Sequence, residues 1–183
     1  MRTAEEMYDY CLQNDYGRGM TRRWALKHFK IIEDNLNYDE EVYMTFIGLK
    51  DFTGVTKHDN NYAYALTNKR IMYGQKKLWG EDFKSIVYDK ITDISSAKGL
   101  VFGLVTIDSL GEKFNVGVDK ITADNISKAA HKIIFSLENR EKRRYLDLRI
   151  DPVEEIRKYK VLMDEGIITE EEFTSKKKKL LKI

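Results

Sequence analysis

The sequence predicts an α+β fold in which one antiparallel sheet of seven strands stands between helices at the two ends of the chain. Two observations carry this prediction. Between Val42 and Val118, short segments with an alternating pattern follow one another without a helix between them, as in antiparallel sheets rather than βαβ units. Helical periodicity, with apolar residues three and four positions apart, is confined to the regions before and after.

The composition is that of a protein with a sizeable apolar core and little overall charge. Apolar residues make up 42% of the 183 residues, and the net charge of +2 favours no acidic partner. Cys11 is the only cysteine, which excludes a disulfide within the chain. No apolar run approaches the roughly 20 residues of a membrane span, and residues 1–6 lack the features of a signal sequence. We expect a cytoplasmic protein.

Residues 1–36 are expected to form an N-terminal helical segment. The spacing of apolar residues predicts a short first helix and, after a turn, a second helix with Thr21 as its N-cap. The apolar residues of the first helix are Ala4, Met7, Tyr8, Cys11 and Leu12, and those of the second are Ala25, Phe29, Ile32 and Leu36.

A β-hairpin over residues 62–73 is the best-defined part of the predicted sheet. Its first strand alternates large residues such as Tyr62 and Tyr64 with small ones, which gives one large-residue face and one small-residue face. We expect Asn68 to take the left-handed conformation of the tight turn, and Gly111 to supply a positive φ in the turn before the last strand. The other predicted strands are residues 42–49, 83–88, 91–95, 104–109 and 113–118.

One strong helix is expected after the strands, because apolar residues recur without a gap from Ile126 to Leu137. Thr122 is its expected N-cap. This helix would cover the open end of the sheet and the apolar surface there, so that residues 37–139 form one domain. The charged stretch 140–151 is either a linker or an extension of the helix.

Residues 152–183 are expected to form a helical hairpin. Asp151 is a favourable N-cap before Pro152, and Gly166 is a favourable C-cap. Thr169 and Glu172 have the spacing of a capping box for the last helix. A unit of about 30 residues is smaller than those that usually fold alone. We therefore expect the hairpin to pack on the rest of the chain or to assemble with copies of itself.

Seven strands followed by one helix are the arrangement of the pleckstrin-homology (PH) superfold, a small barrel or sandwich capped by its C-terminal helix. Residues 36–137 resemble the bacterial PH-like family often called YokE-like. The resemblance is carried by Asp39-Glu40-Glu41, by Ala65-Leu66-Thr67-Asn68-Lys69-Arg70-Ile71, by Ile86, Tyr88 and Asp89, and by residues 91–94 and 99–107. It implies a PH-like fold that binds a partner rather than catalysing a reaction.

The tail resembles the SHOCT family, a short C-terminal domain of many bacterial and phage proteins. Its motif stands here at residues 156–173, which end in Asp-Glu-Gly-Ile-Ile-Thr-Glu-Glu-Glu-Phe, followed by Lys176 and by Leu180 and Leu181. Together the two resemblances imply a bacterial or phage source, and a role in binding and assembly.

No residue pattern indicates catalysis, a metal site or a cofactor. His28, His58 and His131 lie far apart in the sequence and lack partners at metal-ligand spacing, so we expect packing or surface roles for them. Cys11 has no evident base nearby and is expected to be a small buried apolar residue. We predict no enzyme, no cofactor and no small-molecule substrate.

The loop at residues 50–59 corresponds to the phosphoinositide-binding loop of familiar PH domains. Lys50 and Lys57 are offset there by Asp51 and Asp59, and opposite charges in one loop cannot focus a phosphate. The loop therefore departs from the lipid-binding pattern.

The favoured function is a non-enzymatic interaction module. Its PH-like domain would bind a protein or peptide, and its tail would mediate oligomerisation or docking of a partner. Trp79, beside Leu78 in a predicted loop, would either anchor an interface or pack on the N-terminal helices. The predicted partner-binding residues are Leu162, Ile167, Ile168, Phe173, Leu180, Leu181 and Trp79.

Two alternatives stay open. The basic C-terminal helices would make the protein an adaptor at a membrane surface or on nucleic acid, although residues 139–183 carry a net charge of only +3, which favours a solvated helix face. The other alternative is a small-molecule sequestering protein or an enzyme, with a pocket between the N-terminal helices and the sheet.

Overall fold

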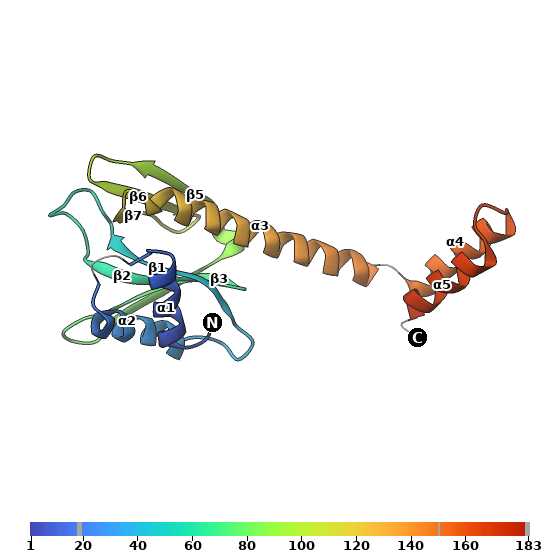
Figure 1. Ribbon diagram of the computed structural model, residues 1–183, viewed down its shortest axis with the longest axis horizontal. Helices are drawn as coiled ribbons and strands as arrows, with labels where there is room; N and C mark the ends of the chain where they lie inside the picture. The colour runs from blue at the N-terminus through green and yellow to red at the C-terminus, as the bar shows by residue number, and fades with distance from the viewer. Residues whose placement is uncertain (18–19, 150, 182–183) are drawn as a thin grey trace. The chain divides into compact units, whose positions relative to one another are not determined.

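The computed structural model describes residues 1–17, 20–149 and 151–181, and of residues 145–149 the backbone alone. The chain divides into two compact units, Met1–Ser136 and Leu137–Ile183 (Figure 1). In the described ranges, every helix is too short or too polar to cross a lipid bilayer.

The first unit is built on a single antiparallel sheet of seven strands, and the predicted α+β, PH-like fold class is confirmed. The strands follow the order β4-β3-β2-β1-β7-β6-β5. A short 3-10 helix, Tyr88–Lys90, joins β4 to β5. The strands are β1 Val42–Lys50, β2 Asn61–Thr67, β3 Arg70–Lys76, β4 Glu81–Val87, β5 Ile91–Lys98, β6 Phe102–Ser109 and β7 Lys113–Asp119.

The sheet curls so that its two halves face each other across the core. Strand β1 pairs with β2 along its length but with β7 only at Leu49 and Lys50. The ring of Tyr73 on β3 lies 5.1 Å from that of Phe114 on β7, although two strands separate β3 from β7 in the sheet. The large-residue face of the predicted hairpin points into this core, where Tyr64 stacks on Phe46 at 4.6 Å.

The small-residue face of the hairpin lies under the N-terminal helices α1 (Ala4–Gln13) and α2 (Arg22–Asp34), which occupy one side of β1–β3 (Figure 1). The hydroxyl of Thr45 on β1 donates to the carbonyl of Met7 at 2.7 Å. Thr21 caps α2 as predicted, because its hydroxyl accepts from the backbone N–H of Trp24. Small side chains on this face let the helices approach the sheet closely.

The turn between β2 and β3 differs from its prediction. Asn68 does not adopt a left-handed backbone, and its side chain instead accepts from the N–H of Glu41 and donates to the carbonyl of Asp39. The hydroxyl of Thr67 accepts the two N–H groups that follow Asn68. Gly111 does not have a positive φ either. Side-chain hydrogen bonds, rather than left-handed residues, close the first of these turns.

A buried ion pair fixes this turn to the start of β1. Glu40 is fully buried, and its carboxylate accepts from the guanidinium of Arg70 at 3.0 Å and from the hydroxyl of Thr67 at 2.7 Å. Lys69 forms a second, exposed ion pair with Asp39 at 2.6 Å. Two of the motifs that carry the PH-like resemblance thus bind each other, and their polar residues serve the fold.

Helix α3 (Thr122–Arg149) follows β7, and its first turns cover the end of the sheet. Ala123, Ile126 and Ala130 are buried, while the side chains of Ser127 and His131 lie 3.0 and 2.6 Å from the carbonyl of Ile94 on the edge strand β5. Thr122 is the first residue of α3 rather than its N-cap, and its hydroxyl donates to Asp119. The basic stretch lies within the helix up to Arg149.

The second unit ends in the helical hairpin of α4 (Pro152–Asp164) and α5 (Glu170–Leu181). The three predicted signals act as expected. The side chain of Asp151 caps α4, and Gly166 has a left-handed φ of 74° after it. Thr169 and Glu172 form the reciprocal hydrogen bonds of a capping box at 2.9 and 3.2 Å.

Candidate interaction surfaces

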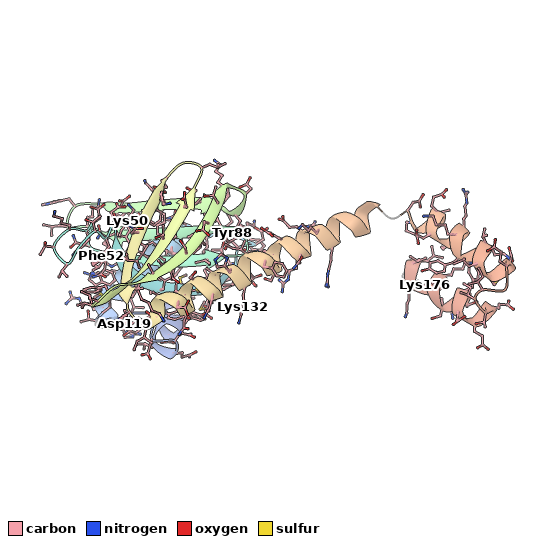
Figure 2. All side chains as sticks on the ribbon, turned by 90° about the horizontal axis from the view of Figure 1, so that it is seen from above. Lys50, Phe52, Tyr88, Asp119, Lys132 and Lys176 are labelled. Atoms are coloured by element: carbon pink, nitrogen blue, oxygen red, sulfur yellow. The ribbon has the colours of Figure 1, made fainter. Side chains whose placement is uncertain are left out.

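The C-terminal hairpin has no buried residue in either helix. Four of the predicted partner-binding residues, Leu162, Ile168, Phe173 and Leu180, are only half-buried where α4 and α5 contact each other. The ammonium group of Lys176 lies 5.3 Å from the ring centre of Tyr159 (Figure 2). Helix caps, this cation–π contact and the half-buried apolar side chains thus hold together two helices that bury no residue completely.

The other two predicted residues of the hairpin are exposed. Ile167 in the turn is 64% exposed, and Leu181 at the end of α5 is 40% exposed. Val153 and Val161 on α4 are each 53% exposed.

Trp79 lies at the tip of the turn between β3 and β4, apart from the hairpin residues in the sequence and in a different unit. It is 88% exposed, and its neighbour Leu78 is 92% exposed. Packing of Trp79 on the N-terminal helices, one of the two predicted alternatives, is therefore wrong. The turn is held by a hydrogen bond from the N–H of Lys77 to the carbonyl of Gly80, whose φ is 79°.

An open hollow of about 650 Å³ lies between α2 and the ends of β2 and β3. Gln75 is buried in its wall and donates to the carbonyls of Asp59 and Asn61 at 3.0 and 3.1 Å. The wall is polar, with the aromatic ring of Trp24 as one side. Sequence reasoning placed a pocket between the N-terminal helices and the sheet, as one of the alternatives, but named none of its residues. Gln75 gave a signal, because it continues the inward-facing series of Ile71 and Tyr73 with a polar residue.

His28 forms part of the same wall. Its ring stacks on that of Trp24 with centres 3.5 Å apart, and its Nδ1 lies 2.8 Å from the carbonyl of Trp24. Burial lowers the pKa of His28, against a smaller opposite effect of that hydrogen bond. Burial therefore favours the neutral imidazole, and the stacked ring has a packing role, one of the two roles expected for it.

At the end of β1, before the loop to β2, the side chain of Lys50 is directed inward, whereas Lys57 in the loop is exposed. Lys50 is buried, pairs with Asp51, and lies 5.1 Å from the ring centre of Phe114. Figure 2 shows Lys50 and Phe52 near each other at one end of the first unit. An ammonium group that is buried and paired in this way cannot neutralise a phosphate outside the protein.

Cys11 is the small buried residue that the sequence predicts. Its Sγ lies 3.3 Å from the hydroxyl of Thr45, and burial raises the pKa of the thiol to about 12. The thiol stays protonated at neutral pH and is a poor nucleophile. Within the described residues, no three His, Cys, Asp or Glu side chains gather at a point that would hold a metal ion.

Comparison with known proteins identifies both parts of the chain. The family model described as bacterial PH domain matches residues 36–135, and that described as short C-terminal domain matches residues 154–181. No curated protein matches. A solved structure named "Critical structural role for the PH and C1 domains of the Vav1 exchange factor" is 9% identical, with a TM-score of 0.36 over 74% of this chain and 32% of that one. The present chain thus spans about a third of its length.

Proposed function

Because the chain belongs to the bacterial PH domain family and also carries a short C-terminal domain, we propose that it is a non-catalytic interaction module. Its PH-like domain binds a protein or peptide. Its C-terminal hairpin mediates self-assembly or docks another protein.

The observation that supports this proposal most is that neither α4 nor α5 contains a buried residue within its described range. Burying a leucine or isoleucine side chain completely is worth roughly 1.5–3 kcal/mol. Within the chain this free energy is largely unrealised for Ile167, which is 64% exposed, and incomplete for Leu181, which is 40% exposed. A second chain would cover them and complete the burial of Leu162, Ile168, Phe173 and Leu180, which are half-buried already.

The experiment for the hairpin replaces its two exposed residues by charges. The double variant Ile167→Asp, Leu181→Asp is compared with the wild-type chain by light scattering. We expect the variant to have the mass of a monomer under conditions in which the wild-type chain forms oligomers or a complex with its partner. The matched control is Leu110→Asp, at a turn of the first unit where the leucine is 76% exposed. Assembly and partner binding unchanged in the double variant would refute the proposed role of the hairpin.

On the PH-like domain, Trp79 and Leu78 are the proposed partner contacts. Exposed tryptophans are frequent energetic centres of protein interfaces. We expect Trp79→Ala to release proteins that the wild-type chain retains from a bacterial lysate, as identified by mass spectrometry. Tyr38→Ala is the control, since Tyr38 is 98% exposed but lies elsewhere, before β1. Equal retention by Trp79→Ala and the wild-type chain would remove Trp79 from the interface.

A second candidate function, binding of a small polar molecule, is favoured by the hollow beside α2. Trp24 on its wall offers a ring for stacking, and Asn60 and Asn61 offer amide groups. In a Trp79→Phe variant, Trp24 is the only tryptophan and reports on the hollow by fluorescence. A change of that fluorescence on addition of nucleosides or amino acids would support this function. If neither class changes the fluorescence, the hollow binds neither nucleosides nor amino acids.

A further inference from the structure

The two helices of the hairpin differ in whether their charged side chains form ion pairs within the helix. In α4, acidic and basic side chains pair within the helix three or four positions apart. These pairs are Arg157 with Glu154 at 3.1 Å, Lys158 with Glu155 at 3.0 Å, and Lys160 with Asp164. The charges of α4 are thus satisfied within one copy of the chain.

The charges of α5 cannot be satisfied in the same way. Three and four positions after Glu170 and Glu171 come only Phe173, Thr174 and Ser175. The lysines begin beyond those positions, and Glu172 is engaged by the capping box with Thr169. Among the described residues, Glu170 and Glu171 form no ion pair, and neither do the lysines at positions 177–179.

Three of these charges, those of Glu170, Glu171 and Lys178, lie on one face of α5. Glu170, Glu171, Thr174, Ser175 and Lys178 line one shallow hollow on this helix. The face is acidic at its start, small and neutral in its middle, and basic at its end. Apolar side chains stand beyond each end of the face, since Ile167 precedes it and Leu181 follows it, and both are exposed. We call this surface the α5 face.

We propose that the α5 face binds the α5 face of a second copy of the chain, with the two helices antiparallel and a two-fold axis passing beside Thr174 and Ser175. This inference rests on the proposed self-assembly of the hairpin, and it names the partner and the orientation. A surface that is acidic at one end and basic at the other is complementary to itself only when one copy is reversed.

The spacing along α5 fits this arrangement at both ends. Glu171 and Lys178 are about 10 Å apart along a helix that rises 1.5 Å per residue. Reversal about the midpoint places Lys178 of one copy opposite Glu170 and Glu171 of the other. It also directs Leu181 of one copy toward Ile167 of the other, which would cover the exposed side chains. The small residues at the centre allow the two backbones to come close.

The charges would set the orientation rather than the strength of the contact, because exposed ion pairs contribute little each. A parallel pair would place acidic residues against acidic residues and basic against basic. In the antiparallel arrangement, each acidic end of one α5 face meets the basic end of the other, and the apolar residues beyond the ends also meet. We therefore assign a second copy, rather than nucleic acid, to this surface, because a polyanion would contact the basic end alone.

The test uses three charge-reversed forms of the full-length chain, measured by sedimentation equilibrium at about 50 mM salt, where screening is weak. The first carries Glu170→Lys and Glu171→Lys, and the second carries Lys177→Glu and Lys178→Glu. Each alone is expected to weaken self-association at least about tenfold. The third form carries all four substitutions and is expected to return to within about threefold of the wild-type chain. An equimolar mixture of the first two is expected to form mixed dimers.

The matched control carries Glu154→Lys and Glu155→Lys, which reverse the same number of charges at the start of α4 instead. It is expected to associate as the wild-type chain does. The antiparallel contact is wrong if the first form associates no more weakly than this control. It is also wrong if the third form, with all four substitutions, does not regain the association of the wild-type chain. In either case the hairpin would still assemble, but through another surface. A wild-type chain that stays monomeric at every concentration refutes the proposed self-assembly itself, and with it this contact.

Discussion

Single side chains in the core differ in whether their polar atoms find a partner. The hydroxyl of Tyr64 is buried without a hydrogen-bond partner among the described residues, whereas that of Tyr73 donates to Glu112. We expect Tyr64→Phe to raise the free energy of unfolding by about 1 kcal/mol, because it removes a buried, unpaired polar group. Tyr73→Phe is the matched control and is expected to lower it by about 1 kcal/mol. Urea unfolding followed by tryptophan fluorescence measures both, and destabilisation by Tyr64→Phe would contradict the assignment.

The ion pair between Glu40 and Arg70 tests whether the resemblance motifs serve the fold. We expect Arg70→Met to lower the free energy of unfolding by about 3–5 kcal/mol, because it leaves the buried carboxylate of Glu40 without its partner. Lys69→Met removes the exposed pair with Asp39 from the same turn and is expected to cost less than about 1 kcal/mol. A similar decrease of the free energy of unfolding in the two variants would show that the buried ion pair stabilises the fold no more than the exposed one.

The same pair predicts a dependence of stability on pH. Burial raises the pKa of Glu40, but the hydrogen bonds from Arg70 and Thr67 outweigh it and hold the pKa below its usual range. The native state therefore binds fewer protons than the unfolded state near the unfolded pKa of about 4.3. The contribution of Glu40 is present above that pH and is lost as the pH falls through the lowered pKa. We expect a Glu40→Gln variant to lose less stability than the wild-type chain in urea unfolding between about pH 6 and pH 3, and an equal loss would contradict this.

Whole elements were predictable where a local pattern decides them. The two-residue period of the hairpin at 62–73 and the helix signals at Asp151, Gly166 and Thr169 all depend on neighbours in the sequence. Their structure therefore follows from backbone geometry and capping chemistry that a sequence displays directly.

Features that depend on distant residues were not predictable in this way. Asn68 was expected in a left-handed turn, yet its side chain bonds to residues that precede β1, and a local pattern cannot show such contacts. The same holds for the pairing of Glu40 with Arg70 and for the residues that line the hollow beside α2. The exposure of Trp79 also depends on where α2 lies, which sequence spacing does not specify.

The turn of the C-terminal hairpin offers a test at the scale of one element. Gly166 has a φ of 74°, which a residue with a Cβ rarely adopts. We expect Gly166→Ala to destabilise the hairpin by about 1 kcal/mol and to raise amide hydrogen exchange throughout α4 and α5 in the full chain. Gly111→Ala is the control, because Gly111 lies in open space without a positive φ. Unchanged exchange in the Gly166→Ala variant would show that the left-handed residue is not required.

At the scale of the whole molecule, the two units differ in how they bury apolar surface. The first unit has an extended core that joins the sheet, α1, α2 and the first turns of α3. Helices α4 and α5 of the hairpin, as far as the structure describes them, contain no buried residue. A chain built in this way is expected to keep its first unit folded at any concentration, and to cover the hairpin only when another chain is present.

The measurement that tests this account most directly is the mass in solution, by light scattering over a range of concentrations, of the full chain and of a chain that ends at Arg149. The account predicts an oligomer for the full chain and a monomer for the shortened one, with the first unit folded in both. Equal oligomers from the two chains would place the assembly surface outside the hairpin and contradict the account.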